Sequence, residues 1–176
     1  MIAAVLGGAS GVWSDLAALK EIAAPGLVIA CNDAGTVYPG RLDGWVTLHA
    51  EKLTGWMDRR PAKDFRAFTI KGHWDHPGGV EIVRERWAGS SGLYGVQIAL
   101  EVLGASRVVL CGVPLDPEKG HYFAPGDPWP EAELYRAGFR AALPVIRDQV
   151  RSMSGYTREL LGAPRPEWLN DWAAAH

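Results

Sequence analysis

Apolar residues gather in four short runs along the chain. The runs cover residues 2–6, 27–31, 45–48 and 107–111. They are rich in branched side chains and nearly continuous rather than alternating, which is typical of strands buried on both faces of a parallel sheet. We therefore predict that the four runs are neighbouring strands of one mainly parallel sheet.

Helical spacing of apolar residues separates these runs. After the first run, apolar residues recur at steps of four, three and four, at Val12, Leu16, Leu19 and Ala23. Before the fourth run, a second helix is expected between Ser90 and Gly104, on the repeat of Leu93, Val96, Leu100 and Leu103. Alternation of strand and helix predicts a single Rossmann-like three-layer α/β domain over residues 1–176, with right-handed crossovers and a C-terminal extension from about residue 156.

Weaker patterns predict the remaining elements. Residues 67–70 resemble a strand, 131–149 a helix, 150–154 a last short strand and 157–161 a final helix. Pro144 should kink or end its helix, because proline cannot donate a hydrogen bond to the preceding turn.

Two stretches lack a regular pattern, at residues 72–79 and 114–130. Loops longer than about 12 to 15 residues inside a compact domain are usually functional or disordered. Residues 114–130 are therefore expected to form a lid or a substrate loop.

Composition narrows the class of protein. The chain has 176 residues, is 48% hydrophobic and carries a net charge of −2, so no overall field would attract nucleic acid or anionic lipid. No run approaches the roughly 20 apolar residues of a membrane span, and the N-terminus lacks the pattern of a signal peptide. Cys31 and Cys111 lie in apolar runs, which favours buried free thiols. We expect a cytoplasmic protein with a small-molecule partner.

The end of the first strand is the first candidate site, since ligands bind beyond the carboxyl ends of parallel strands. There the chain reads Gly7-Gly8-Ala9-Ser10-Gly11, whose small side chains let backbone amides approach an anion at a helix start. The spacing is neither that of a dinucleotide-binding turn nor that of a Walker loop. A glycine turn made only for tight packing is the alternative.

Polar residues also follow the second and third strands. Asn32-Asp33 follows the second, where an amide could bind a base or a ribose, although Asn32 could equally form a simple turn. His49 and Glu51 follow the third and could act in acid–base chemistry. They would face the same side if the chain stayed extended, and a structural role for His49 is the alternative.

Ser90-Ser91-Gly92 opens the helix before the fourth strand. The hydroxyl groups and free amides there would favour a phosphate or carboxylate, whereas ordinary capping explains only one serine. The fourth strand then brings Gly112 and Asp116 to the same edge.

A metal site is conceivable at His73-Trp74-Asp75-His76. Zinc sites need three or four placed ligands, and only His49 and Glu51 could be recruited from elsewhere. A polar loop without metal is favoured, and we expect neither a metal nor a cofactor.

The segment from Ser90 to Asp116 resembles the small-residue helix and following strand of bacterial sialyltransferases that act on lipooligosaccharide. It is also similar to the related family that includes archaeal 6-hydroxymethylpterin diphosphokinases. The matching positions, in order, are Gly7, Gly8, Asn32, Ser90, Ser91, Gly92, Gly112 and Asp116. The resemblance spans roughly residues 1 to 155. The family's Gly-x-Gly-Pro-Ser turn is altered, with Ala9, Ser10 and Gly11 at its last three positions.

The resemblance implies roles for two further residues. His121 is similar in placement to the His-Tyr region from which those enzymes draw a general base. Ser154 lies where a serine or threonine of the family's final turn can face the nucleotide phosphate.

These observations together predict a nucleotide or nucleotide-sugar binding protein of glycosyltransferase-like type. The phosphate would be held by the helix starts at Gly8–Gly11 and Ser90–Gly92, with His121 or His49 as the base. Two alternatives stay open. A diphosphokinase would bring Mg²⁺ to a triphosphate through Asp33, Glu51 and Asp116, and a non-catalytic nucleotide-binding module would use the same cradle without turnover.

Overall fold

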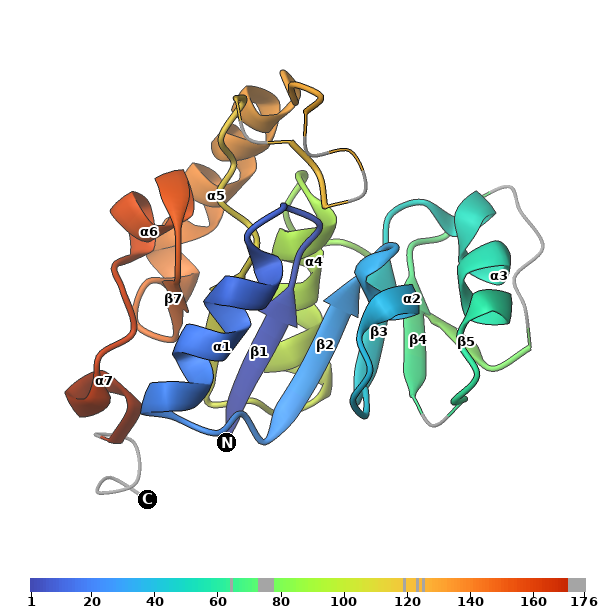
Figure 1. Ribbon diagram of the computed structural model, residues 1–176, viewed down its shortest axis with the longest axis horizontal. Coiled ribbons are helices and arrows are strands. Elements are labelled where there is room, and N and C mark those ends of the chain that lie inside the picture. The colour runs from blue at the N-terminus through green and yellow to red at the C-terminus, as the bar shows by residue number, and fades with distance from the viewer. Residues whose placement is uncertain (64, 73–77, 119, 123, 125, 171–176) are drawn as a thin grey trace.

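One sheet of seven strands forms the centre of the computed structural model, which describes residues 1–63, 65–72, 78–118, 120–122, 124 and 126–170. Every pair of neighbouring strands is parallel, in the order β5-β4-β3-β2-β1-β6-β7. The strands are β1 (Ile2–Leu6), β2 (Leu27–Cys31), β3 (Gly44–Thr47), β4 (Arg66–Thr69), β5 (Val80–Ile82), β6 (Arg107–Cys111) and β7 (Val150–Ser152). Helices cover both faces, so the predicted Rossmann-like three-layer α/β fold is confirmed (Figure 1).

The helices follow the strands along the chain. They are α1 (Val12–Ile22), α2 (Ala34–Val37), α3 (Ala50–Arg59), α4 (Ser91–Gln97), the π-helix η1 (Ile98–Val102), α5 (Ala132–Ile146), α6 (Gly155–Leu161) and α7 (Pro166–Asn170). No helix in the described ranges is long and apolar enough to cross a membrane.

The four predicted strands lie side by side at the centre of the sheet, as β3-β2-β1-β6. Their continuous apolar character has a simple cause, because successive side chains enter different cores. Val5 packs into a core on the α4 side of the sheet, whereas Leu6 packs into a core on the α1 side. Both side chains are fully buried. A strand covered on two faces therefore favours apolar residues at nearly every position.

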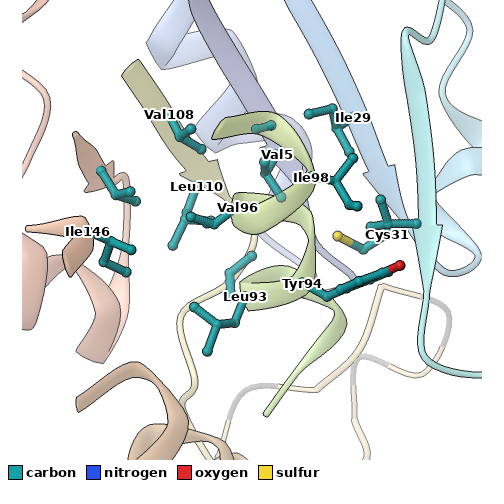
Figure 2. Close-up of a cluster of buried hydrophobic side chains, with 14 of the residues drawn as sticks. Val5, Ile29, Cys31, Leu93, Tyr94, Val96, Ile98, Val108, Leu110 and Ile146 are labelled. Atoms are coloured by element: carbon teal, nitrogen blue, oxygen red, sulfur yellow. The ribbon is translucent and has the colours of Figure 1, made fainter. Parts of the chain in front are cut away.

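The core on the α4 side is shown in Figure 2. Leu93 and Val96 of α4 face Val5 and Leu110 of the sheet, and Ile146 of α5 closes the cluster. The helix predicted over residues 91–103 changes to π-helical geometry after Gln97, where the amide of Leu103 donates to the Ile98 carbonyl at 2.9 Å.

Several elements differ from the prediction. The chain does not stay extended beyond β3, the condition under which His49 and Glu51 would face the same side, because α3 begins at Ala50 with His49 as its N-cap residue. The edge strand β5 and the short helix α2 were not predicted. They contain three and four residues, respectively, which is too few to show a period in their apolar positions. Pro144 lies inside α5, which continues two residues beyond it and ends at Ile146.

Candidate functional site

The order of the strands locates the candidate site. Strands β2 to β5 extend from one side of β1, and β6 and β7 lie on its other side, so the topology reverses between β1 and β6. Ligands of open parallel sheets bind at such a switch point, beyond the carboxyl ends of the strands. Here the amide of Gly7 donates to the Cys111 carbonyl at 2.8 Å, which joins the two strand ends directly.

A cavity of about 470 Å³ opens at this edge of the sheet. Its walls come from the turns after β1, β2, β3 and β6, from the starts of α3 and α4, and from the segment before α5. That last segment lies within residues 114–130, the stretch predicted to be a functional loop, and it reaches over the end of β1 (Figure 1).

Most of the residues singled out in the sequence line this cavity. They are Gly7, Gly8, Asn32, Asp33, His49, Ser90, Ser91, Gly92, Gly112 and His121. Ser10, Asp116 and Ser154 lie outside the lining.

Three backbone amides at the cavity are available to an anion. Those of Gly8, Ser91 and Gly92 have no hydrogen-bond partner in the part of the chain that the structure describes. The last two belong to the first turn of α4, where amides have no acceptor within the helix. All three residues line the cavity, so their amides can converge on one negatively charged group.

The two serine hydroxyls at this helix start have internal roles. Ser90 Oγ accepts from the Leu93 amide at 3.3 Å, an ordinary N-cap. Ser91 Oγ donates to Asn32 Oδ1 at 3.0 Å and accepts from the Leu48 amide at 3.3 Å. The hydroxyls therefore fix the helix to the ends of β2 and β3.

Asn32 organises the centre of the site. Its backbone is left-handed, with φ 52°, and its carbonyl accepts from the indole of Trp45 at 2.6 Å. Its side-chain Oδ1 accepts from Thr47 Oγ1 at 2.8 Å in addition to Ser91. Both hydroxyls donate to Oδ1. The side-chain nitrogen Nδ2 of Asn32 is therefore the polar atom left for a ligand.

His121 and Asp33 form a pair in the cavity wall. His121 Nε2 lies 3.4 Å from Asp33 Oδ1, an oxygen that is buried without a hydrogen bond in the described structure. Burial raises the pKa of the Asp33 carboxyl, and the neighbouring His121 opposes that shift. An imidazole beside a carboxylate is suited to accept and release a proton.

Gly8 makes the position of His121 possible. A Cβ on Gly8 would lie 2.1 Å from His121 Nε2, so only glycine leaves room for the imidazole. Two backbone hydrogen bonds hold the segments together, from Tyr122 to the Gly8 carbonyl at 2.7 Å and from Ser10 to the Gly120 carbonyl at 3.2 Å. Ser10 thus supports the wall of the cavity from outside.

The start of α3 brings ionisable side chains to the cavity. His49 Nδ1 lies 3.5 Å from Glu51 Oε1, and both side chains are substantially exposed. Lys52, which the sequence analysis did not select, lines the cavity and lowers the pKa of Asp33, though less than His121 does. A lysine on an amphipathic helix looks like a solvated surface residue, so no local signal could have revealed it.

Aromatic side chains form much of the remaining lining, and sequence reasoning missed them as well. Trp129 and Tyr135 lie at the α5 end, with ring centroids 5.4 Å apart, and Trp56 lies at the α3 end. The location of Trp129 in a long unpatterned segment is the one signal that could have marked it.

Ser154 has a supporting role behind the cavity. Its hydroxyl donates to Asp15 Oδ2 at 2.7 Å, and the same oxygen accepts from the Gly112 amide at 2.8 Å. Asp116 instead caps its own turn, where its Oδ1 accepts from the Glu118 amide at 3.1 Å.

Cys31 also lines the cavity, as a free and buried thiol. Burial raises its pKa, with a smaller contribution from Asp33. Burial therefore disfavours the thiolate, which is the reactive form of Cys31.

The described residues contain no group of three or more side chains suited to hold a metal ion. The predicted polar loop at His73-Trp74-Asp75-His76 lies outside the described residues. Of the three carboxylates considered for Mg²⁺, Asp33 alone lines the cavity.

Comparisons with family models, curated proteins and solved structures found no match. The chemistry of the site therefore follows from its own residues.

Proposed function

We propose that the protein binds a nucleotide or nucleotide sugar in this cavity and acts as a glycosyltransferase-like enzyme. The observation that carries the proposal is that three amides without an acceptor in the described part of the chain, those of Gly8, Ser91 and Gly92, belong to residues that line one cavity at the switch point of a parallel sheet. Phosphate is the group that such backbone sites bind best. Lys52, which also lines the cavity, adds a positive charge. The sequence resemblance described above points to the same ligand class.

The His121–Asp33 pair favours an enzyme over a passive binding module. In a transfer reaction, an acceptor hydroxyl oxygen bonds to the sugar's anomeric carbon while the bond from that carbon to the phosphate oxygen breaks. His121 takes the hydroxyl proton, and Asp33, 3.4 Å away, stabilises the resulting imidazolium. The amides hold the negative charge that develops on the departing phosphate.

The first test is a thermal-shift screen of nucleoside mono-, di- and triphosphates and nucleotide sugars. A ligand at 100 times its dissociation constant adds about 2.7 kcal/mol of stability. The tightest ligand is then titrated by calorimetry into wild type and two matched variants, Lys52→Gln in the cavity and Lys20→Gln on α1 outside it. We expect Lys52→Gln to weaken binding about threefold to tenfold and Lys20→Gln to leave it unchanged.

Turnover is tested with His121→Asn. This variant should keep its affinity for the nucleotide and lose about 100-fold or more of the transfer or hydrolysis rate without added metal. Unaltered turnover would remove His121 from the mechanism, and absence of any nucleotide ligand would refute the proposal. Replacement of Gly92 by a larger residue is not a clean probe, because its Cβ would lie 2.9 Å from Val113 Cγ1 and strain the fold.

A further inference from the structure

The two ends of the cavity differ in chemistry. The α3 end carries ionisable side chains, with His49, Asp33 and Lys52 in its wall. The α5 end carries Trp129 and Tyr135, together with Asp127. Lys52 favours a phosphate at the α3 end, where the Asp33 carboxyl is paired with His121, and Asp127 disfavours one at the α5 end, so the charged part of a ligand and its ring should occupy different ends.

Trp129 is an aromatic residue of the cavity wall. It lines the cavity, it is only partly buried, and its ring packs against Tyr135 at an interplanar angle of 41°. Its backbone amide donates to the Pro117 carbonyl at 2.8 Å, which fixes this part of the segment. Trp56 at the other end is 8% exposed and packs into the core on the α1 side, so little of its surface remains for stacking.

A close approach of α5 places this aromatic pair next to the anion-binding amides. A Cβ on Gly138 would lie 2.1 Å from the Ala88 carbonyl oxygen, so α5 packs directly against the turn that leads to Ser90. Tyr135 precedes Gly138 by three residues and therefore lies on the same face of the helix. Both Tyr135 and Gly89 line the cavity, which joins the aromatic end to the start of α4.

We propose that the heterocyclic base of the bound nucleotide stacks on Trp129, with its phosphate directed toward the amides of Gly8 and Gly92. This inference rests on the proposed function and adds the orientation of the ligand. Stacking on an aromatic ring is effective for any base because every base has a π-face. Specificity for the base would then come from hydrogen bonds at its edge, and Asp127, which also lines the cavity, supplies a carboxylate that accepts from an amino group.

The test compares AMP, GMP, CMP and UMP with ribose 5-phosphate, which has the same sugar and phosphate but no base. Calorimetric titration of wild type should show the tightest nucleotide binding at least tenfold better than ribose 5-phosphate. Trp129→Leu should weaken the binding of that nucleotide about tenfold and leave the affinity for ribose 5-phosphate unchanged. Trp129→Phe, which keeps an aromatic ring, should lower the affinity for the nucleotide about threefold.

Trp87→Leu is the matched control, because Trp87 also packs partly buried against the same core but does not line the cavity. Equal effects of the Trp87 and Trp129 variants on nucleotide affinity would overturn the stacking inference and leave the proposed function standing. Failure of both nucleotides and ribose 5-phosphate to bind would overturn both. If Trp129→Leu does not fold, Trp129→Phe decides: undiminished nucleotide affinity in that variant contradicts the inference.

Discussion

At the scale of single residues, Gly112 and Gly104 have the same backbone conformation in different surroundings. Their φ angles are 68° and 70°, in the region that side chains rarely adopt. A Cβ on Gly112 would lie 2.4 Å from Val12 Cβ, whereas nothing lies within 4 Å of one on Gly104. Gly112 is therefore needed both for its φ angle and for the contact between β6 and α1.

These two glycines make a matched pair of variants. Gly104→Ala should cost about 1 kcal/mol of unfolding free energy, from the backbone alone. Gly112→Ala should cost about 3 kcal/mol or more, because strain and overlap with Val12 add together. Urea unfolding followed by circular dichroism measures both. Similar losses in the two variants would show that α1 moves freely away from β6.

Asp33 should lower the stability of the protein at neutral pH. Because burial raises the pKa of its carboxyl in the folded state, stability is lost as the pH rises through that pKa. Asp33→Asn should therefore unfold at a higher urea concentration than wild type at pH 7, with a smaller difference near pH 3. The exposed Asp58→Asn in α3 serves as the control. A less stable Asp33→Asn at pH 7 would mean that the contact with His121 outweighs burial.

At the scale of elements, α5 contains the clearest conflict between sequence and structure. Pro144 has no amide to donate to the Arg140 carbonyl, yet the helix continues to Ile146. The apolar face explains this, since Ala142 and Ile146 are fully buried against the sheet on either side of the proline. The packing of this apolar face therefore offsets the free-energy cost of a proline inside the helix.

Replacement of this proline should stabilise the protein. Pro144→Ala restores a hydrogen bond in α5 and should add about 1 to 2 kcal/mol to the unfolding free energy, net of the greater freedom of the unfolded chain. Pro166→Ala is the control, because Pro166 begins α7, where proline is compatible with the helix. Denaturant unfolding of the two variants gives the comparison. A gain from Pro166→Ala as large as that from Pro144→Ala would contradict the explanation.

At the scale of the whole molecule, the order of the strands makes the site. Gly7 and Gly112 follow adjacent strands that are more than 100 residues apart in the sequence, and both line the cavity. The segment before α5 then closes over them, through the pairing of Ala9 with His121. A cavity at this position draws its lining from most of the chain.

The sequence by itself determined the framework. The bounds of β1, β2 and β6 agree with the predicted runs, because strands buried on both faces are mostly apolar and these three end where a polar or glycine residue follows. The same rule located the turns at Gly8 and Asn32, which follow β1 and β2, and helical spacing located the start of α4 at Ser91.

Only the tertiary structure decided what those residues do. Ser91 binds Asn32, Ser154 binds Asp15, and His121 meets Asp33, three contacts between residues at least 59 positions apart. The inclusion of Lys52 and Trp129 in the cavity depends on the placement of α3 and of the segment before α5 in the same way. Periodicity reports which face of an element is buried, but not which residue of another element it meets. That pairing is fixed by the order of the strands and the packing of both layers onto them, which are properties of the whole fold.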